Sequence, residues 1–304
     1  MSFKYINPGY AELLSTSNGT TVTGEQYSKT GVSFWQTTDN QGIQLDKVPS
    51  ELYVRLDMYF KPPENYGDIE LWVCLGRSFG INLKSTYVGS WFMSGFARNQ
   101  ELVLTEDAIP IKTKAINTLW FRLKPGGNND GIFHVIFNDK VLCNKQNLDF
   151  TFYKSSKTLT IYAENNKVLF SNLILSDAPI DPREQIALLQ VAATQTNMTD
   201  CGDGSYEATA AGQELLQSVD VSSLIAQYGG NSRVVSIAPF AKPAYRTAAG
   251  LCALTAIEKG GGTITEQGRH IVGQDTAGYV MGAYDTPLRI AELAERQFGW
   301  RAGT

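Results

Sequence analysis

The stretch TLWFRLKPGGNNDGIFHVIFNDKVLCNKQ, residues 118–146, decides the fold class of this chain. Its apolar runs are separated by PGGNNDG (125–131) and by the tripeptide Asn138-Asp139-Lys140. Short apolar runs bounded by turn residues are typical of strands, and a short polar turn between two such runs is a hairpin signal. The stretch therefore predicts a strand at 118–124 that is followed by a β-hairpin over 132–146.

The rest of the first half repeats this pattern. In ELYVRLDMYF (51–60), alternation places one set of residues on one face of a strand and the other set on the opposite face. The apolar set is Leu52, Val54, Leu56, Met58 and Phe60, and the other set is Tyr53, Arg55, Asp57 and Tyr59. Segments 69–76, 101–105 and 157–177 are also strand-like, and many short strands at regular spacing indicate a sandwich or jelly roll.

The segment APIDPRE (178–184) marks the expected domain boundary, because two prolines and two acidic residues interrupt the periodicity. This divides the chain into a β-sandwich at 1–177 and a smaller β-sandwich at 178–304. Residues 183–193 fit either a linking helix or the first strand of the second domain. In that domain we expect a hairpin turn at 202–205 and one or two short helices, one of them over 221–230 with Ser222 or Asp220 as its cap.

The C-terminal stretch PLRIAELAERQFGWRAG (287–303) carries two conflicting patterns. Its first part spaces apolar residues as a helix does, whereas residues 297–302 alternate as in a strand. In a β-sandwich the second pattern should prevail. We therefore expect a last strand at 297–302, preceded by at most a short turn in which Leu288, Ile290 and Leu293 cover the open end of the sandwich.

Composition narrows the class of protein. The chain of 304 residues is 43% hydrophobic but only 18% charged, and its net charge is -4. The absence of a basic run argues against nucleic-acid binding. We expect no membrane insertion and no secretory signal, because no apolar stretch approaches the ~18 residues of a span and MSFKYINPGYAELL is too polar for a signal peptide.

The four cysteines form no CxxC pair, which argues against a structural zinc site. Cys74 and Cys143 lie in strand-like apolar contexts and are expected to be buried thiols. A disulfide within either half stays open, because each half also holds two of the four, with Cys201 and Cys252 in the second.

The strings TLWFRLK, GIFHVIFNDKVL and FSNLILSD resemble the concanavalin A-like (laminin G-like) sandwich, in which a Trp-bearing strand, an Asn-Asp/Gly-Lys hairpin and a closing SNIIISD-type strand recur. That module often occurs in tail and tail-fibre proteins of phages and prophages. The strings DGSYEATAAGQELLQSVDVSSLIAQYGG, KPAYRTAAGL and FGWRAG are similar to modules found downstream in such proteins. The matches are structural positions and include no catalytic signature.

The resemblance implies an all-β protein with an N-terminal concanavalin A-like jelly roll. It also implies a non-enzymatic structural or adhesion protein of a phage particle (tail, fibre or surface decoration). Made in the host cytoplasm, it would act on the virion after release. Its partners would be other virion proteins and a cell-surface glycan, and it would be a homo-oligomer, with a trimer favoured. Two alternatives remain, namely a capsid or tail decoration protein without a ligand and a glycan-cleaving sandwich enzyme.

Candidate glycan-binding residues are aromatic side chains interleaved with polar ones, because sugars present C–H faces beside hydroxyl edges. STYVGSWFMSGFARNQ (85–100) is the best match, with Tyr87, Trp91, Arg98 and Asn99 as the candidates. Trp35 in SFWQTTDNQG is a second candidate platform. The competing interpretation is that spaced aromatics in a sandwich belong to its core.

The sequence supports no catalytic, metal or cofactor assignment. Asp68 and Glu70 would share a strand face, but the third carboxylate of the hydrolase run that they partly match is absent. His134 and His270 are expected to be structural, since no nucleophile elbow accompanies them. Segment 200–207 has calcium-like oxygen spacing, yet a solvated hairpin turn explains it better.

Overall fold

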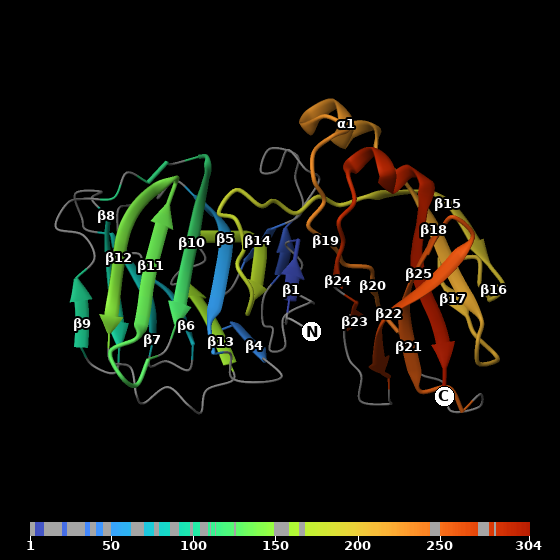
Figure 1. The fold of residues 1–304 in the computed structure, drawn as a ribbon, viewed down its shortest axis with the longest axis horizontal. Helices are drawn as coiled ribbons and strands as arrows, with labels where there is room; N and C mark the ends of the chain where they lie inside the picture. Colours follow the sequence, from blue (N-terminus) through green and yellow to red (C-terminus); the bar gives the residue numbers. More distant parts are fainter. Residues whose placement is uncertain are drawn as a thin grey trace. The chain divides into compact units, whose positions relative to one another are not determined.

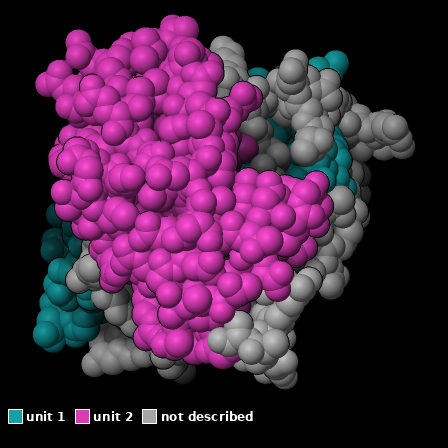
Figure 2. All heavy atoms as spheres, turned by 90° about the vertical axis from the view of Figure 1, so that its right-hand side faces the viewer, with its two compact units in different colours: residues 1–186 teal, residues 187–304 magenta. Residues whose placement is uncertain are grey.

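The computed structural model describes most of the chain, and the account below concerns the described residues only. These are residues 4–8, 20–22, 34–36, 41–44, 50–61, 70–75, 79–85, 91–97, 100–103, 109, 111–112, 114–124, 126–148, 158–163, 168–243, 250–272, 280–282 and 284–304. The chain divides into two compact units, Met1–Ile186 and Ala187–Thr304, which are coloured separately in Figure 2.

The first unit contains two antiparallel sheets, and the chain is an all-β protein as predicted (Figure 1). The eight-stranded sheet runs in the order β12 (Lys140–Leu148), β11 (Gly131–Phe137), β10 (Ile116–Lys124), β5 (Leu52–Phe60), β14 (Val168–Ser176), β3 (Phe34–Gln36) and β2 (Thr20–Val22), with β1 (Lys4–Asn7) also paired to β14. The six-stranded sheet runs in the order β4 (Gln41–Gln44), β13 (Thr158–Ala163), β6 (Glu70–Leu75), β7 (Phe79–Ser85), β8 (Trp91–Ala97) and β9 (Gln100–Val103).

Strict alternation of burial fixes the inner face of the eight-stranded sheet. Every second residue of β11 is buried, from Gly131 to Phe137. These side chains join one core with residues of both sheets, among them Leu56, Phe121, Val73 and Ile161. Burying each such side chain contributes roughly 1.5–3 kcal/mol, so this shared core is the main reason why the two sheets stay together.

The hairpin predicted at residues 132–146 is present. Phe137 pairs with Lys140, and both Asn138 and Asp139 have positive φ angles, of 47° and 66°. A two-residue hairpin turn of type I′ requires this backbone conformation at both central positions, and Asn and Asp tolerate it better than most residues. The side chain of Asn138 further ties the turn to β10, because its Oδ1 accepts a hydrogen bond from the backbone N–H of Thr118 at 2.9 Å.

The second unit is built on a five-stranded antiparallel sheet, in the order β15 (Gln190–Thr196), β18 (Glu214–Asp220), β25 (Arg296–Gly303), β21 (Ala253–Gly260) and β22 (Thr263–Ile271). Three two-stranded ribbons accompany it: β16 (Thr199–Asp200) with β17 (Tyr206–Glu207), β19 (Ser236–Ile237) with β24 (Tyr284–Asp285), and β20 (Phe240–Ala241) with β23 (Val280–Met281). Helix α1 (Ser222–Tyr228) and the 3₁₀ helix η5 (Ile290–Glu295) pack with Phe298 into a small core.

The end of the chain is a strand, as expected. β25 lies between β18 and β21 (Figure 1), and the preceding helical pattern yields only the 3₁₀ helix η5. Leu288, Ile290 and Leu293 are buried beside Phe298. The predicted helix at 221–230 is α1, whose N-cap is Val221; Ser222 and Asp220 are not its cap, although the Asp220 carboxylate accepts a hydrogen bond from the N–H of Ser222.

The segment between the units belongs structurally to the first one. The sequence places the boundary after residue 177, whereas the compact units divide after Ile186. The reason is that Ile180 and Ile186 pack onto Trp120 and its neighbours on the outer face of the eight-stranded sheet. We call residues 178–186 the strap. Of the two alternatives for residues 183–193, the helix is absent and the strand is present in part, because residues 190–193 begin β15, the first strand of the second unit.

Candidate functional site

The residues predicted to bind glycan are only partly covered by the structure. Tyr87, Arg98 and Asn99 lie outside the described residues, and Trp91 begins β8 without a described side chain. Trp35 requires a correction. It is fully buried in β3, 5.5 Å from the ring of Phe170, and it belongs to the core. Its ring therefore presents no face to a ligand.

The carboxylates considered for catalysis, Asp68 and Glu70, and the calcium-like segment 200–207 form no catalytic or metal site among the described residues. Asp68 lies outside the described residues, and Glu70 begins β6 without a described side chain. Residues 200–207 form the ribbon of β16 and β17 around a turn in which Asp200 and Asp203 accept backbone hydrogen bonds. In the part of the chain that the structure describes, no group of three metal-ligating side chains is found. None of the helices described there is long and apolar enough to span a membrane.

All four cysteines are thiols in the structure, so the disulfide that the sequence left open in either half is not formed. Cys74 and Cys143 are buried, as predicted, and Cys201 is exposed. Burial raises the pKa of the Cys143 thiol, which keeps it protonated and makes it a poor nucleophile.

A different set of polar residues meets on the outer face of the eight-stranded sheet. Strand register places Tyr53 of β5 beside Arg122 of β10, Arg122 beside His134 of β11, and His134 beside Asn144 of β12. Residues directly opposite one another on neighbouring strands point to the same face. Together with Glu51, which precedes β5, these four residues form what we call the polar row.

Glu51 holds one end of the polar row together. Its Oε1 accepts a hydrogen bond from the Tyr53 hydroxyl at 2.9 Å and also pairs with Nε of Arg122. The guanidinium carbon of Arg122 lies 5.6 Å from the centre of the Tyr53 ring, within range of a cation–π contact. The side chains of Arg122 and Glu51 are 33% and 24% exposed, so both are accessible to solvent.

Tyr53 is buried beneath this ion pair. Burial raises the pKa of its phenol to about 12, and the hydrogen bond and charge of Glu51 act in the same direction against the opposing effect of Arg122. Tyr53 is therefore a neutral hydrogen-bond donor at physiological pH, and the carboxylate of Glu51 is its acceptor.

His134 is a neutral imidazole in the middle of the polar row. Burial lowers its pKa below 6.5, and the positive charge of Arg122 lowers it further. Its ring meets Trp120 edge-on, with the ring centres 5.1 Å apart. The Nε2 atom is buried and has no hydrogen-bond partner among the described residues. An unpartnered buried polar atom is costly, so His134 retains unused capacity for hydrogen bonding.

The neighbouring half of the same face is apolar and closed. Tyr53, Trp120, Ile174 and Ile180 form a buried cluster, to which Ile136 and Ile186 add partly buried side chains. Nε1 of Trp120 donates a hydrogen bond to the backbone oxygen of Ile180 at 3.1 Å. The strap therefore covers this apolar half, and the polar row lies at its margin.

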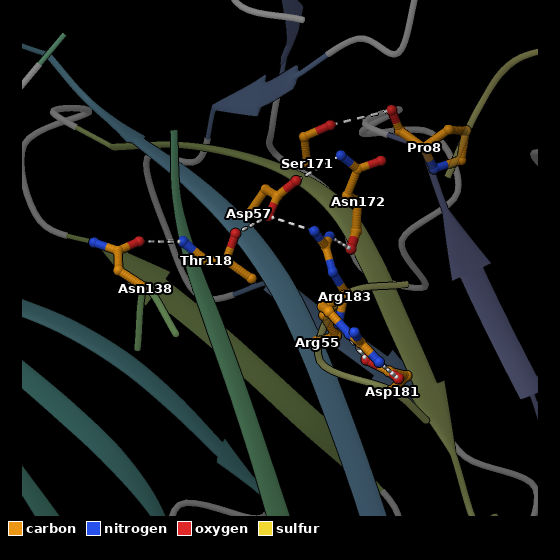
Figure 3. Close-up of polar contacts among 9 residues, drawn as sticks. All are labelled: Pro8, Arg55, Asp57, Thr118, Asn138, Ser171, Asn172, Asp181 and Arg183. Atoms are coloured by element: carbon orange, nitrogen blue, oxygen red, sulfur yellow. Dashed lines mark hydrogen bonds and ion pairs between the residues drawn. The ribbon is translucent and has the colours of Figure 1, made fainter. Parts of the chain in front are cut away.

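Beyond Trp120 the same face contains a buried ion pair (Figure 3). Nη2 of Arg55 lies 2.9 Å from Oδ1 of Asp57, and the two side chains are only 3% and 6% exposed. Asp57 also accepts hydrogen bonds from Thr118 at 2.8 Å and from Asn172 at 2.6 Å. Asn172 has a φ of 49° in a bulge of β14, which brings its backbone oxygen to Nη1 of Arg55. This network ties β5, β10 and β14 together, and it leaves Nε of Arg55 and Oδ1 of Asn172 without a hydrogen-bond partner among the described residues.

The charges near the polar row are balanced. Arg122 is paired with Glu51, and Lys124 is paired with Asp130 at 3.1 Å, which lowers the pKa of Asp130. His134 adds no charge at neutral pH, and Asn144 adds an exposed amide. A surface that offers donors and acceptors without net charge suits a hydroxyl-rich ligand better than a polyanion.

Sequence alternation contained the signal for this site. It separated Tyr53, Arg55 and Asp57 from the apolar face of the same strand, and it placed His134 in a strand. It could not pair Tyr53 with Arg122, because strand partners far apart in sequence are set by the whole sheet. The sequence pattern that indicates the site is a strand face opposite the core that is rich in Tyr, Arg and His.

No protein-family model matches this chain, and no curated protein matches it. Solved structures do resemble it, at low identity. An endo-β-1,4-glucuronan lyase from the fungus Trichoderma reesei is 11% identical, covers 59% of this chain and 98% of its own, and gives a TM-score of 0.45. The alginate lyase vAL-1 from Chlorella virus is 8% identical, covers 56% of this chain and 90% of its own, and gives a TM-score of 0.39. The carbohydrate-binding module CBM66 from Bacillus subtilis is 15% identical, covers 51% of this chain and 90% of its own, and gives a TM-score of 0.32.

These likenesses correct one expectation from the sequence. Several of the similar structures are polysaccharide lyases, which contradicts the expectation of a non-enzymatic protein. None of the neighbours shown is a phage protein, so the assignment to a phage particle, the virion partners and the trimeric state stay predictions.

Proposed function

We propose that the first unit binds a hydroxyl-rich glycan through the polar row of Glu51, Tyr53, Arg122, His134 and Asn144. The observation that carries the proposal is the partly exposed Glu51–Arg122 pair, which lies in register with His134 and Asn144 across adjacent strands. A carboxylate accepts hydrogen bonds from sugar hydroxyls, and a guanidinium and an amide donate to them.

The rigidity of this face favours binding. Each residue of the row except Glu51 lies within a strand, and Trp120 packs beside the row against His134 and Tyr53. Side chains that are already held in place lose little conformational entropy when a ligand arrives. A shallow polar surface of this kind gives weak single-site affinity, so multivalent display on a glycan-coated surface would be the effective mode.

The test is a glycan array probed with the intact chain, followed by calorimetric titration of the strongest glycan. Arg122→Gln keeps a hydrogen-bonding side chain but removes the charge that holds Glu51, and it should weaken binding about tenfold. Arg183→Gln is the matched control, because Arg183 also pairs with a carboxylate, that of Asp181, but is 83% exposed and outside the row. Equal affinities of the two variants, or an array without any bound glycan, would contradict the proposal.

A second candidate function is cleavage of an acidic glycan by elimination, and the order Tyr53, Arg122, His134 across three strands favours it. In this scheme Arg122 holds the sugar carboxylate and neutral His134 takes the proton from the adjacent carbon. The C–H electron pair becomes a carbon–carbon double bond while the glycosidic C–O bond breaks, and Tyr53 protonates the leaving oxygen. Incubation with alginate or glucuronan should then increase the ultraviolet absorbance of the unsaturated product. His134→Gln should abolish that increase, and no increase with the unaltered chain would contradict this candidate.

We also propose that the chain works on a phage or phage-like particle as a homo-oligomer, with other virion proteins as partners. Its low content of charged residues, 18%, supports an assembled surface protein. Light scattering on the purified chain should give three times the 33.4 kDa of one chain. A monomer at all concentrations would contradict this setting.

A further inference from the structure

A second cluster of polar side chains lies in the other unit. The carboxylate of Glu258 on β21 is approached by Gln267 of β22 and Arg296 of β25. Burial raises the pKa of the Tyr284 hydroxyl on β24, and the charge of Glu258 and a weak hydrogen-bonding interaction with it act in the same direction. Three further strands, β22, β24 and β25, thus direct polar groups at one carboxylate on β21. We call these four residues the Glu258 cluster.

Two local features of the backbone place these side chains. β22 contains a bulge opposite Ala256 and Ile257, which makes Gln267 the extra residue of the strand and brings its side chain to Glu258. Bulges often redirect a side chain in this way beside functional sites. At the end of β21, Gly260 leaves room for Arg296, because a Cβ atom on Gly260 would lie 1.9 Å from the guanidinium Nη1.

The bonding within the cluster is incomplete. Nη1 of Arg296 is 3.4 Å from Oε1 of Glu258, and Nε2 of Gln267 is 3.4 Å from Oε2. Charge-assisted hydrogen bonds are normally about 2.7–2.9 Å long. The hydroxyl oxygen of Tyr284 is buried and interacts with Glu258 only weakly, without a well-formed hydrogen bond among the described residues. Each of these groups can therefore form a shorter hydrogen bond with an added molecule.

The unused hydrogen-bonding capacity of the Glu258 cluster matters because its carboxylate is mostly buried. The side chain of Glu258 is 11% exposed, whereas that of Arg296 is 36% exposed and Gln267 and Tyr284 are partly buried, so the cluster meets solvent around the carboxylate. Glu258 pairs in register with Phe298, and Tyr284 packs against the small core that contains Phe298. A carboxylate with weak partners in such surroundings is costly unless a ligand or water completes its hydrogen bonds.

The chemistry of the cluster defines its ligand. The charges of Glu258 and Arg296 cancel, which disfavours an ion as the ligand. Glu258 offers two acceptor oxygens, Arg296 and Gln267 offer donors, and Tyr284 offers one of each. Two adjacent hydroxyl groups can donate to a carboxylate while they accept from an amide and a guanidinium, so a vicinal diol matches this set.

We propose that the Glu258 cluster is a second ligand site, which binds a vicinal diol of a neutral saccharide. It is independent of the polar row, because the two sites share no residue and lie in different units. With both sites, one chain would contact two sugars of one glycan or of two neighbouring glycans, which raises the effective affinity.

The test uses the intact chain and four probes: D-glucose, D-galactose, D-mannose and, as a probe with one hydroxyl group, tetrahydropyran-2-methanol. Saturation-transfer NMR titrations measure each dissociation constant for the unaltered chain and for Arg122→Gln, Arg183→Gln, Glu258→Gln and Tyr284→Phe. At least one hexose should bind saturably, and tetrahydropyran-2-methanol should not. Glu258→Gln and Tyr284→Phe should each weaken that binding about fivefold, whereas Arg183→Gln, which lies outside both sites, should leave it unchanged.

The outcomes separate the two proposals. Weaker hexose binding by Glu258→Gln and by Tyr284→Phe, with Arg183→Gln unchanged, supports the second site whatever Arg122→Gln does. A loss of binding in Arg122→Gln alone overturns the second site and supports the polar row. Tyr284→Phe removes a single oxygen, so it keeps the test valid if Glu258→Gln fails to fold, and the thermal midpoint of each variant reports on folding. Absence of saturable binding by all three hexoses would overturn the second site.

Discussion

Nε1 of Trp120 donates a hydrogen bond to the backbone oxygen of Ile180, 3.1 Å away, and this bond ties the strap to the outer face of the eight-stranded sheet. The contact decides which part of that face a ligand can reach. It closes the half that contains Trp120 and leaves Glu51 and Arg122 partly exposed beside it.

Ile180→Ala should destabilise the first unit by about 2–4 kcal/mol, because it removes a buried side chain and leaves a cavity over Trp120. Urea unfolding followed by circular dichroism measures the change. Ile225→Ala is the control, since Ile225 is 39% exposed on α1 and its removal should change stability by less than about 0.5 kcal/mol. Similar losses in both variants would show that the strap does not stabilise this face.

Asp57→Ala should be more damaging, with a loss of about 3–5 kcal/mol, because it leaves the charge of Arg55 buried without its partner. The double variant Arg55→Met/Asp57→Leu should recover most of this loss, since it removes both charges and keeps the volume filled. A double-mutant cycle based on urea unfolding measures the coupling. If the double variant were no more stable than Asp57→Ala, the cost would lie in packing rather than in the unpaired charge.

Gly299→Ala should disrupt the five-stranded sheet. A Cβ atom at this position would lie 1.8 Å from the backbone oxygen of Leu215, so β25 would have to move away from β18. We expect a loss of about 1–3 kcal/mol, the usual cost of overpacking. Gly303→Ala on the same strand is the matched control, since its Cβ would meet Ala253 at an ordinary 3.8 Å. Equal thermal midpoints of the two variants would contradict this account of the sheet.

Stability should fall on acidification through His134. Its folded pKa lies below the unfolded value of about 6.5, so the unfolded chain binds the proton more readily than the folded one. The loss should begin as the pH drops below about 6.5 and level off below the lowered folded pKa. The imidazole resonance of His134 in NMR should titrate below pH 6.5, and His134→Gln should flatten the stability profile in this range. An unchanged profile would show that His134 is not the group responsible.

The sequence predicted the elements whose pattern is local. Residues 131–137 alternate between core and outer face, and the Asn138-Asp139 turn requires backbone angles that these residues tolerate, so this hairpin could be derived without long-range information. The final strand could also be derived, because alternation at 297–302 conflicts with a helix. These predictions needed only periodicity and turn chemistry.

The remaining features depend on distant partners. The prolines of the strap indicated a linker, and only the structure places Ile180 on Trp120. The polar sequence around Trp35 is typical of an exposed aromatic platform, but the pairing of β3 with β14 places the ring of Trp35 in the core. The polar row combines β5 with β10, β11 and β12, and no local pattern specifies that register.

The most direct test of the central claim is the affinity of Arg122→Gln for the glycan that the intact chain binds best, measured by calorimetric titration beside Arg183→Gln. The account predicts that the first variant loses about tenfold in affinity while the second binds as the unaltered chain does. Retention of full affinity by Arg122→Gln, with its fold intact by circular dichroism, would contradict the assignment of glycan binding to the polar row.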